Sequence, residues 1–268
     1  MEIKRAIGRT VPYPVIEGAR KVLHYGLGKT CPVCNSHVRR FLSQGKGHPV
    51  LDELEVVGGM TRPNDVCPVC HANDRDRLIM HYLETAWLPV RRRPASVLHM
   101  APEKGLSRLI LTWPDIEYVA GDIEPGRYRH LRSVKGVNLL DLPFADRSFD
   151  LLLCNHVLEH LVDDGRAMRE IRRVLRPEGI AILQVPLAMR LETTREGDGS
   201  ETEAEKIYLY GQKDHVRMYA PGDYRERLEA AGLAVELYDA SRQAPDAVAA
   251  LSLNPREILH VCRPAAPC

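Results

Sequence analysis

Four of the seven cysteines in this 268-residue chain fall into two identical units whose spacing suits metal binding. The tetrapeptide Cys-Pro-Val-Cys occurs at residues 31–34 and again at 67–70, with strand-like segments between the copies. Two such pairs complete a tetrahedral site of four thiolates around Zn²⁺, and a site filled in this way has no open position for catalysis. A redox dithiol is the alternative, but the presence of two copies, the first without a strand–motif–helix context, disfavours it. The sequence predicts a structural zinc ribbon with ligands Cys31, Cys34, Cys67 and Cys70.

A second set of reactive side chains, three histidines and an arginine, lies in two segments further along the chain. His156 and His160, in the heptapeptide Asn-His-Val-Leu-Glu-His-Leu, are four residues apart and would share one face of a helical turn. They are candidates for proton transfer, for metal binding without an identified third ligand, or simply for packing. His215 is the leading candidate for a general base or a substrate anchor. Arg217 could hold a carboxylate or a phosphate, or could form a local ion pair with Asp214.

Positioning these side chains requires a sheet, and the pattern of the chain predicts one. From Ala95 onward apolar runs alternate with helical patterns, and helices are expected at 73–88, 163–179 and 220–232. This alternation predicts an α/β fold with a doubly wound, mostly parallel sheet, which binds ligands at the carboxyl ends of its strands. The seven expected strands are 96–101, 116–121, 136–140, 149–154, 179–186, 233–239 and 257–262.

The organisation into domains follows from a break in this pattern. Residues 89–95 place two prolines around three arginines without periodicity, which indicates a boundary. We expect a module at 1–88, with an N-terminal helix and the zinc ribbon, and a domain at 95–268. The polar stretch 191–206 follows the fifth strand and is predicted to be a lid over a binding site or a disordered loop.

Three segments between residues 137 and 186 carry a family resemblance. The pieces DLPFADRSFD, NHVLEHL and REIRRVLRPEG occur in this order and spacing. Together they closely resemble the class I S-adenosylmethionine-dependent methyltransferases, and the resemblance covers about residues 95–265. The segments LHMAPE and GQKDHVRMY also resemble a subgroup of these enzymes that carries a zinc ribbon. The resemblance implies a seven-stranded sheet with S-adenosylmethionine across its first strands.

The resemblance places the methionine end of the cofactor at the turn after the first strand. The family usually has an acidic residue followed by a glycine-rich turn. Here His99 takes the acidic position, Ala101 and Glu103 take glycine positions, and Gly105 remains. S-adenosylmethionine has no pyrophosphate, so the turn need not cradle phosphates. It needs an acceptor for the ammonium, which Glu103 can supply, and donors for the carboxylate, which the following helix N-terminus can supply. We therefore expect a working cofactor site.

The resemblance also places the nucleoside. Asp122 ends the second expected strand and would accept hydrogen bonds from the ribose hydroxyls, as in dinucleotide folds; capping of the next segment is its alternative role. The Asp141 carboxylate and the Leu142 backbone N–H would contact the adenine. Asn155, just past the fourth strand, would face the reacting side of the cofactor.

The expected activity is methyl transfer to N or O of a small-molecule acceptor by in-line displacement. The cofactor carries the activation, so the protein mainly aligns the reactants and excludes water. A general base is needed only where the acceptor must lose a proton. An RNA methyltransferase that uses the ribbon for RNA contact is one alternative, and a non-catalytic zinc-ribbon interaction protein is another.

Charge and composition bear on partners and compartment. Residues 1–94 carry a net charge of +6 and the rest −5, but no basic run exceeds three arginines, so a nucleic-acid partner is the less favoured reading. No apolar run is long enough to span a membrane, and the N-terminus lacks a signal-peptide pattern. We therefore expect a cytoplasmic protein with reduced cysteines.

Overall fold

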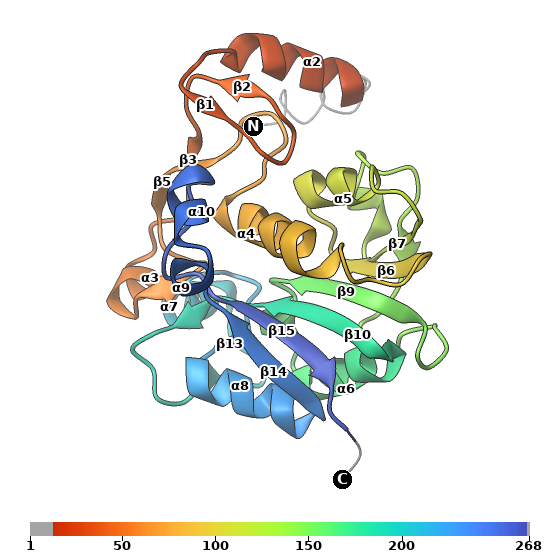
Figure 1. Cartoon of the computed structure of the whole chain (residues 1–268). Helices are drawn as coiled ribbons and strands as arrows, with labels where there is room; N and C mark the ends of the chain where they lie inside the picture. Colours follow the sequence, from red (N-terminus) through yellow and green to blue (C-terminus); the bar gives the residue numbers. More distant parts are fainter. Residues whose placement is uncertain (1–12, 267–268) are drawn as a thin grey trace.

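The computed structural model describes residues 13–266 and is organised around one seven-stranded sheet (Figure 1). The strand order is β14-β15-β10-β9-β6-β7-β8. β15 runs antiparallel to both of its neighbours, and the other ladders are parallel. This confirms the predicted doubly wound, mostly parallel fold. The strands are β6 (Ala95–Met100), β7 (Ile116–Asp122), β8 (Lys135–Gly136), β9 (Phe149–Asn155), β10 (Leu175–Gln184), β14 (Leu233–Tyr238) and β15 (Leu259–Pro264).

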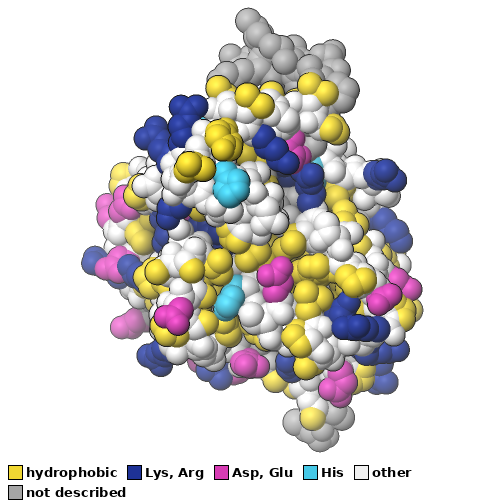
Figure 2. All heavy atoms as spheres, turned by 45° about the horizontal axis from the view of Figure 1, so that its top comes forward, with side chains coloured by type: hydrophobic (Ala, Val, Ile, Leu, Met, Phe, Trp, Pro, Cys, Tyr) yellow, Lys and Arg dark blue, Asp and Glu magenta, His cyan; other side chains and the backbone are white. Residues whose placement is uncertain are grey.

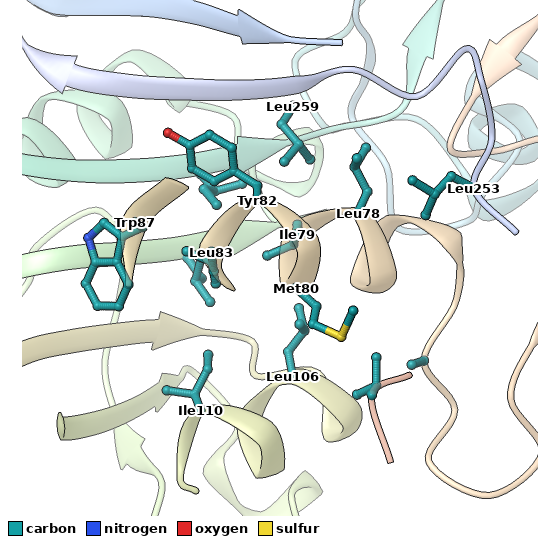
Figure 3. Close-up of a cluster of buried hydrophobic side chains, with 14 of the residues drawn as sticks. Leu78, Ile79, Met80, Tyr82, Leu83, Trp87, Leu106, Ile110, Leu253 and Leu259 are labelled. Atoms are coloured by element: carbon teal, nitrogen blue, oxygen red, sulfur yellow. The ribbon is translucent and has the colours of Figure 1, made fainter. Parts of the chain in front are cut away.

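Helices cover both faces of this sheet, so that its central strands are buried on both sides. All seven residues of β9 are buried. On one face, α4 (Asp74–Tyr82) and α5 (Lys104–Ile110) pack on the sheet, with Leu78, Ile79 and Leu106 among the side chains that fill the space (Figure 3). On the other face lie α6 (Asp164–Val174) and α8 (Pro221–Ala230) (Figure 1). α9 (Ala240–Gln243) and α10 (Pro245–Ala250) lead into β15.

The predicted helices and strands exist, but several of their ends differ. α4 begins as expected, since Asn73 and Asp76 form a capping box, yet the helix widens after Tyr82 into a π-helical turn, η1 (Leu83–Trp87). α6 ends at Val174, before the predicted end at residue 179, because the chain enters β10 there. β8 is shorter than the predicted strand 136–140 because the chain turns at Asn138, whose side chain accepts the N–H of Leu140.

The N-terminal part is built from short elements around the cysteines. They are α2 (Tyr13–His24), β1 (Lys29–Thr30), β2 (His37–Val38), β3 (Leu42–Gln44), α3 (Pro49–Glu53), β4 (Val56–Val57) and β5 (Arg62–Val66). The short strands expected between the cysteine pairs are present, and β1–β2 and β3–β5 form antiparallel ladders. β4 pairs instead with β11 (Leu187–Ala188), which follows β10. The insert between the cysteine pairs is thereby attached next to the carboxyl edge of the sheet.

Arg77 of α4 connects this N-terminal part to the C-terminal segment. Its fully buried guanidinium pairs with Asp65 at 3.2 Å and donates to the carbonyls of Leu251 and Ser252. Hydrophobic residues near the cysteines, including Val33, belong to one cluster with residues of β6 and β9. The division between 1–88 and 95–268 stays a prediction, since the packing is continuous across it.

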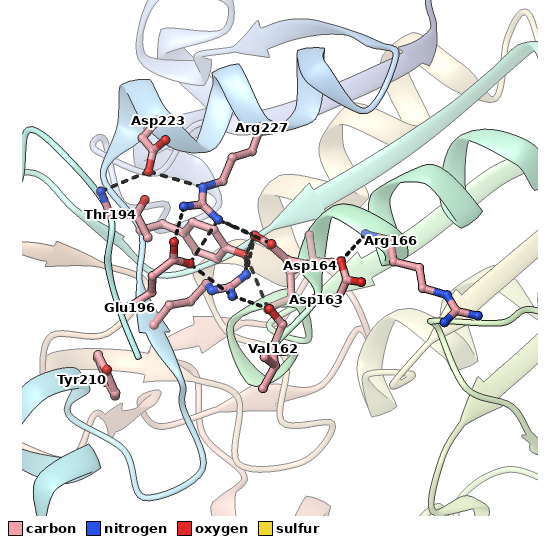
Figure 4. Close-up of polar contacts among 12 residues, drawn as sticks. Val162, Asp163, Asp164, Arg166, Thr194, Glu196, Tyr210, Asp223 and Arg227 are labelled. Carbon is pink, nitrogen blue, oxygen red and sulfur yellow. Dashed lines mark hydrogen bonds and ion pairs between the residues drawn. The ribbon is translucent and has the colours of Figure 1, made fainter. Parts of the chain in front are cut away.

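The stretch 191–206, for which a lid or a disordered loop was predicted, is folded against α8. β12 (Arg195–Glu196) pairs with β13 (Arg217–Met218), and α7 (Glu203–Tyr210) starts with a capping box of Thr202 and Glu205. Glu196 lies against Arg227 of α8 (Figure 4). Two 3₁₀ turns, η2 (Pro125–Arg127) and η3 (Leu158–His160), complete the described elements. Within residues 13–266, no helix combines the length and the apolar composition needed to cross a membrane.

Candidate functional site

The four predicted metal ligands converge on one point. The Sγ atoms of Cys31 and Cys70 are 3.6 Å apart, those of Cys34 and Cys67 are 3.8 Å apart, and all four lie within 4.8 Å of one another. A tetrahedron with Zn–S bonds of about 2.3 Å has sulfur–sulfur edges of about 3.8 Å. The donor set and its spacing therefore fit a zinc ion closely.

The two cysteine pairs share one backbone conformation, which explains the convergence. The N–H of Asn35 donates to the Cys31 carbonyl, and the N–H of His71 donates to the Cys67 carbonyl. Asn35 and His71 both have left-handed φ angles, +53° and +67°. We call these two loops, 31–36 and 67–72, the cysteine knuckles. The His71 ring contacts Arg20 rather than the thiols, so His71 is not a ligand.

The cysteine knuckles pack directly on the turn that follows β6. A Cβ added to Gly105 would meet the Cβ of Ala72 at 3.0 Å and Cγ1 of Val33 at 3.2 Å. Lys104 donates from its Nζ to the carbonyl of Val69 at 2.8 Å. Gly105, predicted from the family pattern to serve the cofactor, is thus a glycine at a close contact between α5 and the knuckles.

The β6 turn holds a buried chain of polar groups. His99 is fully buried, with Nε2 at 2.6 Å from a Glu103 carboxylate oxygen and Nδ1 at 2.9 Å from the Tyr118 hydroxyl. Burial raises the pKa of Glu103, but the hydrogen bond with His99 and the charge of Arg75 bring that pKa below its ordinary value. Glu103 is therefore ionised, and its other oxygen, Oε1, is buried without a hydrogen-bond partner. Ala101 has the left-handed φ of +47° that a glycine would adopt without strain.

Arg75, which the sequence analysis did not single out, also belongs to this site. It lies in the first turn of α4, five residues after Cys70, and is buried together with its charged neighbours. Its Nη2 atom is 3.7 Å from Glu103 Oε1 and 4.0 Å from Asp76 Oδ1, and its Nε atom has no partner. Burial and the nearby Glu103 raise the pKa of Asp76 to about 7. The sequence did contain a signal that could have identified Arg75. It is the run of four charged residues, 74–77, in a helix that must be buried.

The nucleoside positions differ in how far the structure supports them. Asp122 ends β7 as expected and is buried, and its two oxygens accept one hydrogen bond each, from the Glu124 N–H at 2.7 Å and the Tyr128 hydroxyl at 2.5 Å. Each carboxylate oxygen retains capacity for a further donor. Asp141 is exposed. The Leu142 N–H donates to Glu170 at 2.8 Å, so donation to an adenine would have to replace this bond.

The end of β9 and the turn after it bring together the predicted Asn155 and the three predicted histidines. Asn155 is 3% exposed, and neither atom of its amide has a partner. His156 adopts a left-handed φ of +53° and has its Nδ1 atom 3.6 Å from Glu159 Oε1. His215, 2% exposed, has its Nε2 atom 4.0 Å from the same oxygen. His156 also faces Gly58 of the β4–β5 loop, which closes over this edge of the sheet.

Burial shifts the ionisation of this group. It raises the pKa of Glu159 to about 7, lowers the pKa of His215 to about 3, and lowers the pKa of His156 well below its ordinary value. Both imidazoles are therefore neutral at pH 7 and keep a lone pair. His160 lies beside both Glu159 and His215, and the two imidazole ring centroids are 4.7 Å apart.

Arg217 has a different role from the one expected. Its guanidinium pairs with Asp164 at 2.5 Å and with Glu196 at 3.2 Å and donates to the Val162 carbonyl, so it is not available for a substrate anion. The predicted alternative, a pair with Asp214, is also wrong, because Asp214 lies beside His160. The network in Figure 4 instead fixes the segment that carries His215 against α6 and α8.

Comparison with known proteins identifies the part of the chain that contains the ends of β7 and β9. Residues 105–183 match the family model of a methyltransferase domain. The match covers less than half of the chain and assigns this segment to a methyltransferase domain. S-adenosylmethionine is the methyl donor that this domain implies.

Two relatives resemble parts of the chain. A probable S-adenosylmethionine-dependent methyltransferase of Mycobacterium tuberculosis is 36% identical over 76 residues, which are 26% of this chain and 28% of that protein. An uncharacterized protein of Methanocaldococcus jannaschii is 52% identical over 48 residues, 18% of this chain and 21% of that protein. The chain thus spans less than a third of the length of these relatives.

A solved structure supports the fold of the methyltransferase domain over a longer range. The cyclase SpnF covers 82% of this chain and 94% of its own, with 16% identity and a TM-score of 0.51. An identity this low shows a shared fold alone.

Proposed function

We propose that the protein binds S-adenosylmethionine at the carboxyl ends of β6, β7 and β9 and transfers its methyl group to N or O of a small acceptor. One observation carries the cofactor site: buried polar atoms without partners gather there, on Glu103, Arg75 and Asn155. Buried polar groups are ordinarily hydrogen-bonded. Their concentration where the strand order reverses, the ligand position of such sheets, favours a polar ligand.

The side chains fit the parts of this cofactor. Asp122 would accept the ribose hydroxyls, and Glu103 Oε1 would accept the ammonium of the methionine part. Arg75, loosely held by Glu103 and Asp76, would donate to the carboxylate. Asp141 and Leu142 are proposed beside the adenine, and His99 and Ala101 shape the turn. When bound, the cofactor supplies an activated methyl group on a sulfonium.

The acceptor would lie on the side of Asn155 that the histidines line. We propose His215, His156 and His160 as the residues that contact it, because they surround Glu159 at the end of β9. Their roles are to orient the acceptor and, where it must lose a proton, to receive that proton. The insert at Gly58 and the segment before β13 cover these groups and exclude water.

We propose that the four cysteines hold a structural Zn²⁺. A closed set of four thiolates has no position for a substrate. The contacts of Ala72, Val33 and Val69 with α5 support a bracing role, in which the knuckles fix the turn that carries Glu103.

A small acceptor is favoured over RNA because segments of the chain cover the site and the basic side chains form no continuous track on the face in Figure 2. There the Lys and Arg side chains lie in separate groups, with hydrophobic, acidic and other side chains between them. Nucleic-acid binding relies on a continuous track of positive charge.

The test is calorimetry with S-adenosylhomocysteine and with methylthioadenosine, which lacks the amino-acid part. We expect one mole of each ligand per chain. Glu103→Gln should weaken S-adenosylhomocysteine by roughly tenfold, about 1.4 kcal/mol, and leave methylthioadenosine unchanged. No binding of either ligand would refute the cofactor site and favour a non-catalytic role, and salt-sensitive RNA affinity in the same preparation would favour the RNA enzyme.

A further inference from the structure

A second cluster of metal-binding side chains lies apart from the cysteine knuckles. Within the described residues, Glu159, His160 and His215 each offer a donor atom, and these atoms lie within 4.8 Å of one another. The sequence placed His156 and His160 together without a third ligand. The structure supplies a carboxylate from the same turn and an imidazole from a segment 55 residues further along the chain.

Backbone contacts hold these side chains in place. Glu159 and His160 lie in η3, and the Val216 N–H donates to the Glu159 carbonyl at 3.0 Å. His160 Nδ1 is 2.9 Å from the Asp214 carbonyl oxygen, to which it donates. A metal-binding histidine commonly donates its second ring N–H to a carbonyl in this way. The other nitrogen of His160, Nε2, is thereby left with a lone pair.

Two members of the cluster are buried with every polar atom unpartnered. Glu159 is 1% exposed, and both of its carboxylate oxygens lack a hydrogen bond. His215 is 2% exposed, and both of its ring nitrogens lack one. Leaving a buried polar group unsatisfied costs about 1–3 kcal/mol, and more for a charged one. One donor atom of each of these two residues lies within 4.8 Å of the other and of a His160 ring nitrogen, which indicates that a ligand binds between them.

We propose that Glu159, His160 and His215 bind a divalent transition-metal ion, with Zn²⁺ the ion that the donor set fits best. Two imidazoles and a carboxylate are the ligands of several catalytic zinc sites, which keep a fourth position open. In a tetrahedral site, metal–ligand bonds of about 2.0–2.2 Å place neighbouring donors about 3.3–3.6 Å apart. The 4.0 Å between Glu159 Oε1 and His215 Nε2 requires a movement of less than about 1 Å.

The open position would face His156, whose Nδ1 is 3.6 Å from Glu159 Oε1. An acceptor hydroxyl bound there would give its proton more readily to the neutral imidazole of His156, because a metal ion lowers the pKa of a bound hydroxyl. This consequence rests on the proposed function and narrows the acceptor to one with a hydroxyl at the methylated position. Metal binding itself does not depend on it.

The test counts metal ions in the full-length protein, purified in the presence of Zn²⁺ and freed of excess ion. Elemental analysis should find two ions per chain, one for the cysteines and one for this cluster. Glu159→Gln and His215→Asn should each retain one ion. The control Glu203→Gln, at an exposed side chain of α7, should retain two. One ion in the wild-type protein, or two in both cluster variants, would overturn the proposal.

X-ray absorption at the zinc edge keeps the test valid if a variant fails to fold. The wild-type protein should show a nitrogen and oxygen shell near 2.0–2.1 Å beside the sulfur shell near 2.3 Å. A sulfur shell alone would overturn the proposal. Neither measurement uses S-adenosylmethionine, so failure of the metal site and failure of the cofactor site are distinguishable.

Discussion

Replacement of Asp122 by asparagine tests whether this carboxylate binds the ribose of the cofactor. The carboxylate is buried at the end of β7, and each of its oxygens already accepts one hydrogen bond, from Glu124 N–H and from Tyr128. In Asp122→Asn one acceptor oxygen becomes an NH₂ donor and the charge is lost. Shape and volume are preserved, so the change is confined to hydrogen bonding.

The expected loss of affinity follows from the number of bonds to the charged group. A hydrogen bond to an ionised group contributes about 1.5–3 kcal/mol. Losing one ribose bond outright and weakening the second gives about 2–3 kcal/mol in all, which raises Kd roughly 30- to 160-fold. Because methylthioadenosine has the same ribose, it should lose the same factor as S-adenosylhomocysteine. Glu103→Gln, in contrast, should affect only the ligand with the amino-acid part.

Calorimetry provides the measurement, and Glu124→Gln provides the matched control. This variant removes the same charge two residues away from an exposed side chain, and it should change Kd by less than about twofold. Urea unfolding without ligand checks that both variants are folded. If Asp122→Asn binds both ligands within about threefold of the wild-type protein, the ribose is bound elsewhere and the placement of the cofactor is wrong.

Three further predictions concern the framework of the site. Arg77→Met should lower the free energy of unfolding in urea by about 3–5 kcal/mol, because it leaves the buried Asp65 carboxylate without its charged partner. Arg225→Met removes one side of a half-exposed ion pair and should cost less than about 0.5 kcal/mol. Equal effects of the two substitutions would contradict the stabilising role of the buried Arg77–Asp65 pair. Gly105→Ala should lower the free energy of unfolding by about 1–3 kcal/mol, because the added methyl group would clash with the cysteine knuckles. Gly126→Ala, where the added methyl group meets open space, should leave the free energy of unfolding almost unchanged. If Gly105→Ala also leaves it unchanged, the contact between α5 and the knuckles is loose. Burial lowers the pKa of His260 to about 4, so the folded state stays neutral while the unfolded state binds a proton below pH 6.5, and stability is lost as the pH falls through that window. His260→Gln should therefore remove about 2 kcal/mol of the difference in unfolding free energy between pH 7 and pH 5; a difference between the two pH values that is the same in His260→Gln as in the wild-type protein would refute the assignment.

The sequence predicted the sheet well because a central parallel strand must be apolar on both faces. The run at 149–154 could be placed from composition alone, and β9 occupies Phe149–Asn155. The ends of helices and strands were less predictable where the following helix or strand determines them. α6 stops at Val174 because β10 starts there, although the helical pattern of the sequence runs on.

The candidate site was predictable where one residue follows one strand and was missed where distant segments meet. Asp122 and Asn155 end β7 and β9, where the sequence places them at or next to strand ends, and the roles that the resemblance implies for them stay predictions. Arg75 was missed because α4 reads as an ordinary amphipathic helix, and only packing shows that its charged first turn is buried beside Glu103. Arg217 was misjudged because its partners, Asp164 and Glu196, lie far away in the sequence.

The proposed bracing by the cysteine knuckles would account for a turn with few glycines. A glycine-rich turn bends freely, whereas here Ala101 must hold a left-handed conformation that costs about 1–2 kcal/mol. Such strain persists only where the surroundings fix the backbone. In this proposal the knuckles restrain the turn through the contacts of Ala72 and Val33 with Gly105. The chain that leaves the second knuckle places Arg75 against Glu103 of the same turn. A closed cluster of four thiols that does no chemistry itself can in this way determine the geometry of the neighbouring site.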